Sequence, residues 1–278
     1  MLLACSLAAL AGEPPAAVSS SAHVVNPATG ASLAVYVDAP QGSGPFPALV
    51  AVPGGTSAGG EEISEGARRR FAAAGVVLVR FDPDGRGQSG GTEDFQGARQ
   101  QAGVRAVIDW AVAQPYIQDD RVGVMSSSAG LLMAAPALAG GPHHARFLLD
   151  WEGPPTQAWL TGCLPGAGGI EWRRRCDDTA FWSERSALLA LPRIGVPYWR
   201  VQGMPDHKDF TDHQMVYMAL DAAASGHLPW VRINDAPPTS IAYSHATIDA
   251  ALLPKFTGPT RFDTVTRYAL EAFRALTP

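Results

Sequence analysis

The chain has 278 residues, of which 46% are hydrophobic and 17% are charged. This composition supplies enough apolar side chains for a buried core and excludes a disordered chain, and the length suits one α/β domain better than two small ones. A formal net charge of −5 provides no basic face for phosphate groups, so we expect no nucleic-acid partner.

The amino-terminal segment is apolar and rich in Ala and Leu over residues 1–12, but it is too short to span a bilayer as a helix. It resembles the remnant of a secretory signal, and Leu2 to Cys5 resembles a bacterial lipoprotein cleavage box in which Cys5 carries the lipid anchor. We therefore expect residues 1–22 to be a signal remnant and tether, and residues 23–278 to form the catalytic domain. The expected location is outside the cell or in the cell envelope of a bacterium.

From Ala31 onward, short β-branched apolar runs alternate with longer stretches of helical periodicity. This alternation predicts an α/β fold with a mostly parallel central sheet flanked by helices, and the continuous apolar runs are typical of strands covered on both faces. The predicted strands are Leu33–Val37, Ala48–Pro53, Val76–Phe81, Val122–Ser126, Phe147–Trp151, Tyr198–Gln202 and Trp230–Asn234. The predicted helices are Glu61–Ala74, Asp94–Ala113, Ala129–Ala139, Asp209–Ser225 and Arg261–Leu276.

Residues 152–192 interrupt this alternation with a Gly-Pro-Pro sequence, a Gly-rich loop and no convincing strand. A connection of this length inside a compact domain is usually functional, so we predict a lid-like insertion after strand six of the fold. Cys163 and Cys176 lie close together in it. If Cys5 is lost or lipidated, these two form an even set, which in an oxidising compartment predicts a disulfide; two buried thiols are the alternative.

A strand runs directly into a turn of small residues and then a helix at Ser126-Ser127-Ser128-Ala129-Gly130. A nucleophile elbow needs small residues two positions before and two positions after the nucleophile, so that the backbone can turn sharply and expose the hydroxyl. Ser128 meets this condition, although Ser126 stands where Gly is usual. Ser128 is therefore the predicted nucleophile, with Ser126 and Ser127 as rivals. A serine before Ala-Gly is by itself more often a helix cap, so the surrounding motifs decide.

Two turns upstream support the elbow. A Gly-rich turn after the second predicted strand would aim the backbone N–H of Gly55 or Thr56 at a developing oxyanion, with the N–H of Ala129 as the second donor. The segment from Asp82 to Gly90 resembles the D-x-R-G-x-G-x-S loop of many α/β-hydrolases, with Asp84 in the Arg position. In this order and spacing the motifs resemble the α/β-hydrolase superfamily, in particular dienelactone-hydrolase-like enzymes and the catalytic domains of oligopeptidases.

This resemblance implies the chain order nucleophile, acid, histidine. Asp206 follows the strand Tyr198–Gln202 in a G-x-x-D sequence, the common acid position, and His245 follows the last predicted strand in the position of the base. The base is assigned by position more than by motif. Alternatives for the acid are Asp209, Asp212, Asp150 and Glu152, and alternatives for the base are His207 and His213. His143 and His144 lie in a loop on the wrong side of the sheet order for a catalytic base, so they are interpreted as structural.

With these roles, His245 takes the proton of Ser128 as its Oγ attacks a carbonyl carbon, and water then hydrolyses the acyl-enzyme. The expected function is hydrolysis of small-molecule carboxylic esters. A small-peptide or amide hydrolase of the oligopeptidase type is the alternative, and a non-catalytic binding module that retains the fold is a third hypothesis.

An apolar substrate pocket is expected from Trp151, Trp159 and Trp182, for which core packing is the alternative role. The histidines are scattered, so the sequence predicts no metal site. Neither G-x-G-x-x-G nor a P-loop occurs, and we expect no cofactor.

Overall fold

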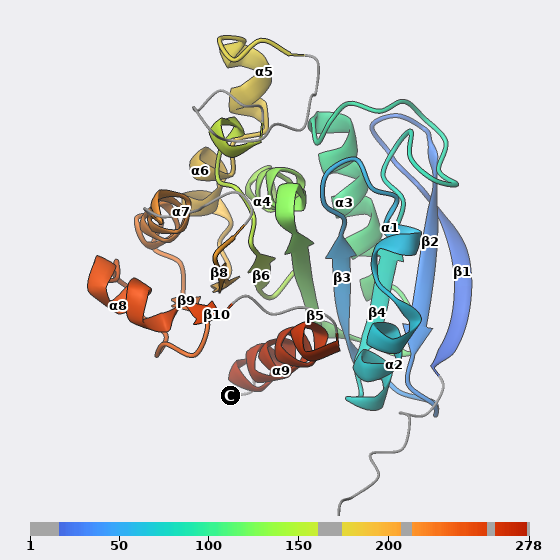
Figure 1. Cartoon of the computed structure of the whole chain (residues 1–278). Helices are drawn as coiled ribbons and strands as arrows, with labels where there is room; N and C mark the ends of the chain where they lie inside the picture. Colours follow the sequence, from blue (N-terminus) through green and yellow to red (C-terminus); the bar gives the residue numbers. More distant parts are fainter. Residues whose placement is uncertain (1–16, 161–173, 207–212, 255–258, 277–278) are drawn as a thin grey trace, which may run out of the picture.

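A central sheet of eight strands runs through the molecule in the order β1-β2-β4-β3-β5-β6-β7-β9 (Figure 1). The computed structural model describes residues 17–160, 174–206, 213–254 and 259–276. The first two strands pair antiparallel to their neighbours and all later pairs are parallel, which confirms the predicted mostly parallel sheet. The strands are β1 (Val18–Val25), β2 (Ser32–Ala39), β3 (Phe46–Val52), β4 (Val77–Phe81), β5 (Ile117–Ser127), β6 (Leu148–Trp151), β7 (Tyr198–Val201) and β9 (Val231–Ile233).

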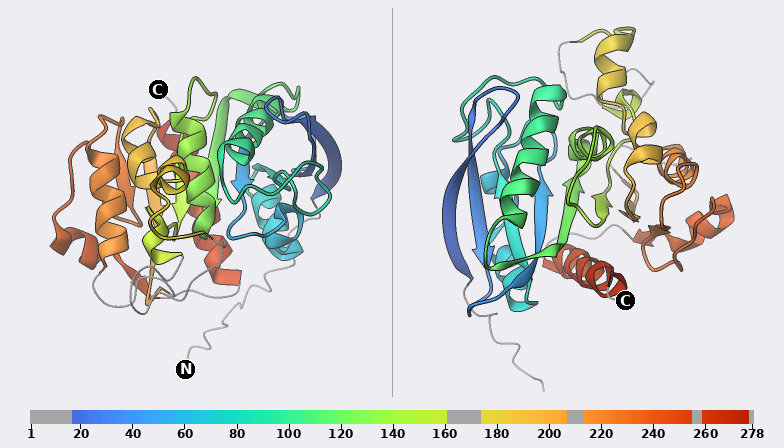
Figure 2. Two further views of the ribbon diagram at one scale, coloured as in Figure 1. Left: turned by 90° about the horizontal axis from the view of Figure 1, so that it is seen from above. Right: turned by 180° about the vertical axis from the view of Figure 1, so that it is seen from behind.

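Helices cover both faces of this sheet (Figure 2). Along β3, Ala48, Val50 and Val52 belong to one buried cluster, whereas Leu49 and Ala51 belong to the other. This period of two explains why consecutive positions of β3 are apolar, since its side chains enter the core on both faces of the sheet. The helices of the first cluster are α3 (Ala98–Val112), α4 (Leu131–Ala139), α6 (Ala187–Ala190) and α7 (Gln214–Ala224), and those of the second are α2 (Glu65–Ala73) and α9 (Pro259–Ala275).

Several predicted boundaries differ from the structure, and two of the differences have a clear physical reason. The expected tether at residues 1–22 overlaps β1, because Val18–Val25 pairs along its whole length with β2. The helix expected from Asp94 begins at Ala98, because the Asp94 carboxylate accepts hydrogen bonds from the N–H groups of Gly97 (3.1 Å) and Arg99 (2.9 Å). A side chain in that role lies before the helix rather than within it.

The described part of residues 152–192 contains short helices and no strand: η2 (Gln157–Trp159), α5 (Thr179–Glu184), α6 and η3 (Leu191–Arg193). Arg185 anchors this segment to the loop before α3, because its guanidinium donates to the carbonyl oxygens of Phe95 (2.8 Å) and Asp94 (2.6 Å). Cys163 lies outside the described residues, so its disulfide with Cys176 stays a prediction. The role of the segment as a lid also stays a prediction.

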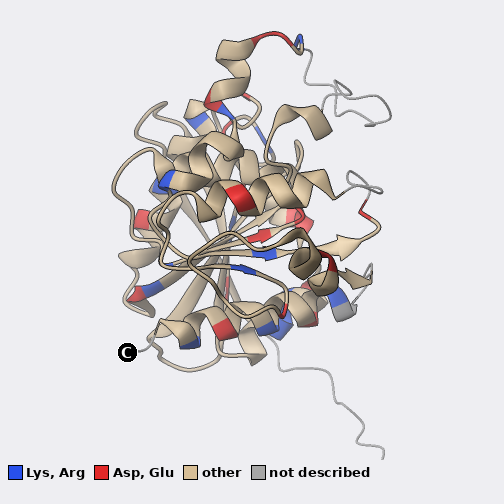
Figure 3. Ribbon diagram, turned by 90° about the vertical axis from the view of Figure 1, so that its left-hand side faces the viewer, with Lys and Arg blue, Asp and Glu red and all other residues tan. Residues whose placement is uncertain are grey.

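Basic and acidic residues are interspersed on the side of the molecule seen in Figure 3. Cys5 and the rest of residues 1–16 lie outside the described part of the chain. Within the described ranges, no helix is long and apolar enough to cross a membrane.

Candidate active site

Ser128 occupies the junction between β5 and the helix that follows. The strand ends at Ser127, Ser128 begins the short helix η1 (Ser128–Gly130), and α4 continues from Leu131. Ser128 has a φ of +48°. A residue with a Cβ pays about 1–2 kcal/mol to adopt this left-handed conformation, and such strain is concentrated at functional sites. The backbone therefore has the geometry of a nucleophile elbow at Ser128 and not at either rival serine.

Different structural constraints explain the two small residues that flank Ser128. A Cβ on Gly130 would lie 2.7 Å from the carbonyl oxygens of Val52 and Pro53, so the end of β3 leaves no room for a side chain. Ser126 is fully buried, and its Oγ donates to Asp150 Oδ1 at 3.3 Å. A hydroxyl at this position thus has a buried partner, which accounts for Ser in place of the usual Gly.

The Gly-rich turn after β3 lies against the elbow. The N–H of Ser57 donates to the carbonyl of Gly54 at 3.0 Å, and Gly55 adopts a φ of +52°. A Cβ built on Gly54 would be 3.2 Å from the Cβ of Ser128, so the close approach of this turn to the candidate nucleophile requires glycine.

The carbonyl of Gly55 is held by two side chains. Arg86 Nη1 donates to it at 3.0 Å and Gln96 Nε2 donates as well, while Glu93 forms an ion pair with Arg86 at 2.6 Å. In a planar trans peptide the N–H points opposite to the C=O. The N–H of Thr56 is therefore turned away from Arg86 and Gln96. Arg86 and Gln96 thus fix the orientation of one predicted oxyanion donor, a role that the sequence did not indicate.

Glu62 is a further charged residue at this site that the sequence did not single out. Its carboxylate accepts the N–H of Gly54 at 3.0 and 3.2 Å, so this N–H is already bonded within the protein. Burial raises the pKa of Glu62, against the opposing effects of hydrogen bonds from Ser127 and Gly54 and the positive charge of Arg261. Glu62, Ser127 and Arg261 line a small cavity together with apolar residues that include Trp151.

The predicted acid Asp206 follows β7 and the short strand β8 (Gly203–Met204), and it is 2% exposed. Its Oδ2 accepts a hydrogen bond from Gln202 Nε2 at 3.1 Å. The alternative Asp150 is fully buried and forms an ion pair with Arg200 at 2.7 Å. Glu152 has a φ of +52°, and its Oε1 accepts the N–H of Gly203 at 3.0 Å. Asp209 and Asp212 lie outside the described residues.

The predicted base His245 lies on a short helix that follows the last strand of the sheet. His245 is the first residue of α8 (His245–Ala251), is exposed, and stacks on the ring of Tyr217 with centroids 3.8 Å apart. The opposite end of α8 approaches the acid, because Asn234 Nδ2 donates to the carbonyl of Ala251 at 2.8 Å. Ala251 lies about 9 Å along the helix axis from His245, at 1.5 Å per residue.

The remaining histidines occupy different places. His213 precedes α7 with a φ of +53°, and its ring lies 6.2 Å from that of Tyr217. His207 lies outside the described residues. His143 Nε2 bonds to the carbonyl of Ile194 at 2.9 Å, in agreement with its interpretation as structural.

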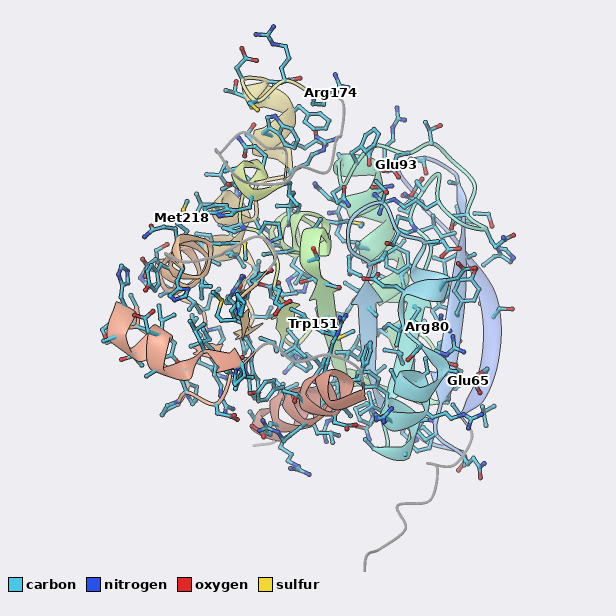
Figure 4. The ribbon with its side chains drawn as sticks, in the orientation of Figure 1. Glu65, Arg80, Glu93, Trp151, Arg174 and Met218 are labelled. Atoms are coloured by element: carbon cyan, nitrogen blue, oxygen red, sulfur yellow. The ribbon has the colours of Figure 1, made fainter. Side chains whose placement is uncertain are left out.

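The three predicted pocket aromatics do not share one environment. Trp182 belongs to the first core cluster and donates from Nε1 to the carbonyl of Arg175 at 2.8 Å, so it packs in the core. Trp159 is also buried. Trp151 lies at the centre of the molecule at the end of β6 (Figure 4), with the guanidinium of Arg261 4.0 Å from its ring centroid. Only Trp151 of the three lines the cavity beside Ser127.

A sequence-family model described as X-Pro dipeptidyl-peptidase (S15 family) matches residues 29–153, a range that includes Ser128 but ends before Asp206. An esterase of Pyrococcus furiosus superimposes with a TM-score of 0.63 at 15% identity, covering 94% of this chain and 92% of that one. This chain is an α/β-hydrolase by fold. The α/β-hydrolase has no sequence match among curated proteins.

Larger enzymes share the same fold. Dipeptidyl peptidase 4 of Porphyromonas gingivalis matches with a TM-score of 0.69 at 16% identity, covering 94% of this chain and 36% of that chain. The α/β-hydrolase thus spans about a third of that peptidase. The 2,6-dihydroxy-pseudo-oxynicotine hydrolase matches with a TM-score of 0.60 at 19% identity, covering 94% and 69% of the two chains. These likenesses show that the chain shares the fold of these enzymes.

The described residues contain no group of three or more His, Cys, Asp and Glu side chains suited to a metal ion.

Proposed function

We propose that this α/β-hydrolase is a serine hydrolase that cleaves carboxylic esters of small molecules through an acyl-enzyme on Ser128. The observation that carries the proposal is the φ of +48° at Ser128, at the point where a buried strand meets a helix. This conformation costs free energy, and at a nucleophile elbow it presents the hydroxyl for attack.

In the proposed reaction, Ser128 Oγ attacks the ester carbonyl carbon and gives its proton to a histidine that Asp206 orients. The N–H of Ala129 and an N–H of the Gly55–Thr56 turn bind the oxyanion. The tetrahedral intermediate then expels the alcohol, which takes the proton from the histidine. Water hydrolyses the acyl-enzyme by the same path and frees Ser128.

Three substitutions test which histidine acts as the base: His245→Ala, His207→Ala and His213→Ala. Chain order assigns this role to His245. The exposed position of His245 on Tyr217 favours a histidine that follows Asp206 more closely in the chain. A loss of turnover in His207→Ala or His213→Ala with activity retained in His245→Ala assigns the base to the segment after the acid. The reverse result assigns the base to His245.

The nucleophile is tested by covalent labelling with a fluorophosphonate probe and by turnover of p-nitrophenyl esters. We expect Ser128→Ala to abolish labelling and to lower kcat by about 10⁴-fold or more, as loss of a nucleophile does in such units. Ser127→Ala should cost far less. Undiminished labelling or turnover in Ser128→Ala would overturn the proposal, and a chain that never reacts with the probe would favour a non-catalytic binding module.

Hydrolysis of small peptides or amides is the second candidate function. The match to the X-Pro dipeptidyl-peptidase family model over residues 29–153 favours it, and several similar structures are peptidases. Aminoacyl anilides assayed beside p-nitrophenyl esters compare the two classes directly. A higher kcat/KM for the anilides would assign the chain to peptide or amide hydrolysis, with the same nucleophile.

A further inference from the structure

A buried guanidinium lies next to the predicted acid. Arg200 on β7 is fully buried, and its Nη1 donates to Asp150 Oδ2 at 2.7 Å and to the carbonyl of Gly153 at 2.8 Å. Its other donors face Gln202: Nε lies 3.0 Å and Nη2 lies 2.6 Å from Gln202 Oε1. Since a guanidinium can only donate hydrogen bonds, it fixes which end of the Gln202 amide it faces.

The amide of Gln202 therefore has one orientation. Its Oε1 accepts from Arg200, so its Nε2 is turned toward Asp206, where it donates to Oδ2 at 3.1 Å. The main chain of Gln202 is held as well, because its N–H donates to Asn234 Oδ1 at 2.9 Å and its carbonyl accepts from Asn234 Nδ2 at 2.8 Å. Hydrogen bonds thus fix both the backbone of Gln202, through Asn234, and its side chain, which faces Asp206.

The hydrogen-bond network of Arg200 also extends to the strand that carries Ser128. Asp150 accepts hydrogen bonds from Ser126 Oγ at 3.3 Å and from Tyr198 OH at 2.6 Å, besides the ion pair with Arg200. Ser126 precedes Ser128 by two residues. A continuous chain of buried hydrogen bonds therefore connects the strand of the candidate nucleophile to the carboxylate of the candidate acid, across β6.

We propose that Gln202 is a positioning residue that holds the Asp206 carboxylate for catalysis, with its amide oriented by Arg200. The inference rests on the proposed function, because it takes Asp206 as the acid of a Ser128 hydrolase. An acid that orients a histidine must itself be fixed, and a buried donor that cannot turn around supplies this.

The Gln202→Glu substitution distinguishes a role of Gln202 in positioning Asp206 from a role in stabilising the fold. The new carboxylate still accepts from Arg200, so we expect the melting temperature to stay within a few degrees of the wild type. The donor to Asp206 becomes an acceptor and a like charge, which disfavours the present position of the carboxylate. We expect kcat to fall by about 10- to 100-fold at pH 8 with KM little changed, as for a misplaced catalytic group. The deficit should shrink as the pH is lowered toward 5, because a proton shared by the two carboxyl groups restores a donor.

The control is Gln118→Glu, the same change near the opposite end of β5. The Gln118 side chain donates to the carbonyl of Pro45 at 3.1 Å, and it lies ten residues from Ser128, or about 33 Å along an extended strand. This variant should show wild-type kcat at every pH. A Gln118→Glu variant with the same pH-dependent deficit would overturn the inference, since the effect would then belong to added charge in general.

A double-mutant cycle with Asp206→Asn completes the test and remains informative if Gln202→Glu is poorly folded, because Gln202→Met can take its place. If Gln202 acts through Asp206, its substitution should slow fluorophosphonate labelling of Ser128 by less than about 2-fold once Asp206 is Asn. An equal loss in both backgrounds, or wild-type kcat in Gln202→Glu, overturns the inference alone. Full activity in Asp206→Asn would instead refute the proposed acid, and an unlabelled wild-type chain would refute the proposed function.

Discussion

Replacing Ser128 by Gly and by Ala measures the strain at the elbow without any assay of catalysis. Both substitutions remove the hydroxyl, but Ala keeps a Cβ at a φ of +48° and Gly does not. A glycine adopts positive φ at no steric cost. We therefore expect the Gly variant to be more stable than the Ala variant, which reverses the order found at ordinary positions.

The expected difference follows from two opposing terms. Relief of the left-handed conformation favours Gly by about 1–2 kcal/mol. The greater freedom of Gly in the unfolded chain favours Ala by about 0.5–1 kcal/mol. The net advantage of Ser128→Gly over Ser128→Ala is then about 0–1.5 kcal/mol, with a midpoint of about 0.75 kcal/mol. This midpoint corresponds to a melting temperature higher by about 1.5–3 °C in a domain of this size.

Thermal and urea unfolding followed by circular dichroism measure this difference. Ala73→Gly supplies the matched comparison, because Ala73 is an exposed residue of α2 with helical geometry. There Gly should be less stable than Ala by about 0.5–1 kcal/mol. If Ser128→Gly is also less stable than Ser128→Ala by that amount, Ser128 is not held in a strained elbow and the assignment of the nucleophile loses its main support.

Three further changes test the surroundings of the elbow. Gly130→Ala should destabilise the fold by about 1–3 kcal/mol and slow probe labelling, because its Cβ would lie 2.7 Å from two carbonyl oxygens at the end of β3. Arg86→Gln removes the donor to Gly55 and should lower kcat by about 10- to 100-fold with a smaller change in KM; an unchanged kcat would contradict its role. Glu62→Gln concerns a carboxyl whose pKa is raised by burial, so the folded state binds its proton more tightly than the unfolded state. Stability from this carboxyl is present at low pH and is lost as the pH rises through the folded pKa, so the melting temperature of Glu62→Gln relative to wild type should increase from pH 4 to pH 8.

The fold could be predicted from the sequence because the parallel strands are mostly apolar runs that alternate with helices, and because the turn motifs lie at strand ends. The sequence did not indicate the first strand or the exact start of α3. The strand β1 reads VSSSAHVV and is largely exposed at one edge, so its composition resembles a tether. The start of α3 depends on how the Asp94 side chain bonds, which periodicity does not reveal.

At the site, the residues that a local motif could identify are the elbow and the Gly-rich turn. Small residues at fixed spacing are required by the backbone geometry itself, and Gly130 and Gly54 are in fact where a side chain would collide. The sequence did not indicate the roles of Arg86 and Gln96, because each donates to the carbonyl of Gly55, 31 and 41 residues away in the chain. Only the folded arrangement of the strands makes these pairs neighbours.

The path of the chain between β9 and α8 determines where His245 lies. After β9 the chain reverses at Asn234, and Thr239 pairs antiparallel with Val231, so the polypeptide returns toward the amino end of β9 before α8 begins. The helix then leads back to the acid, and Leu253 bonds to the carbonyl of Gln202 at 3.3 Å. His245, at the start of α8, therefore lies one helix length from Ala251. The substitutions His245→Ala, His207→Ala and His213→Ala therefore decide which histidine serves Ser128, because chain order alone does not.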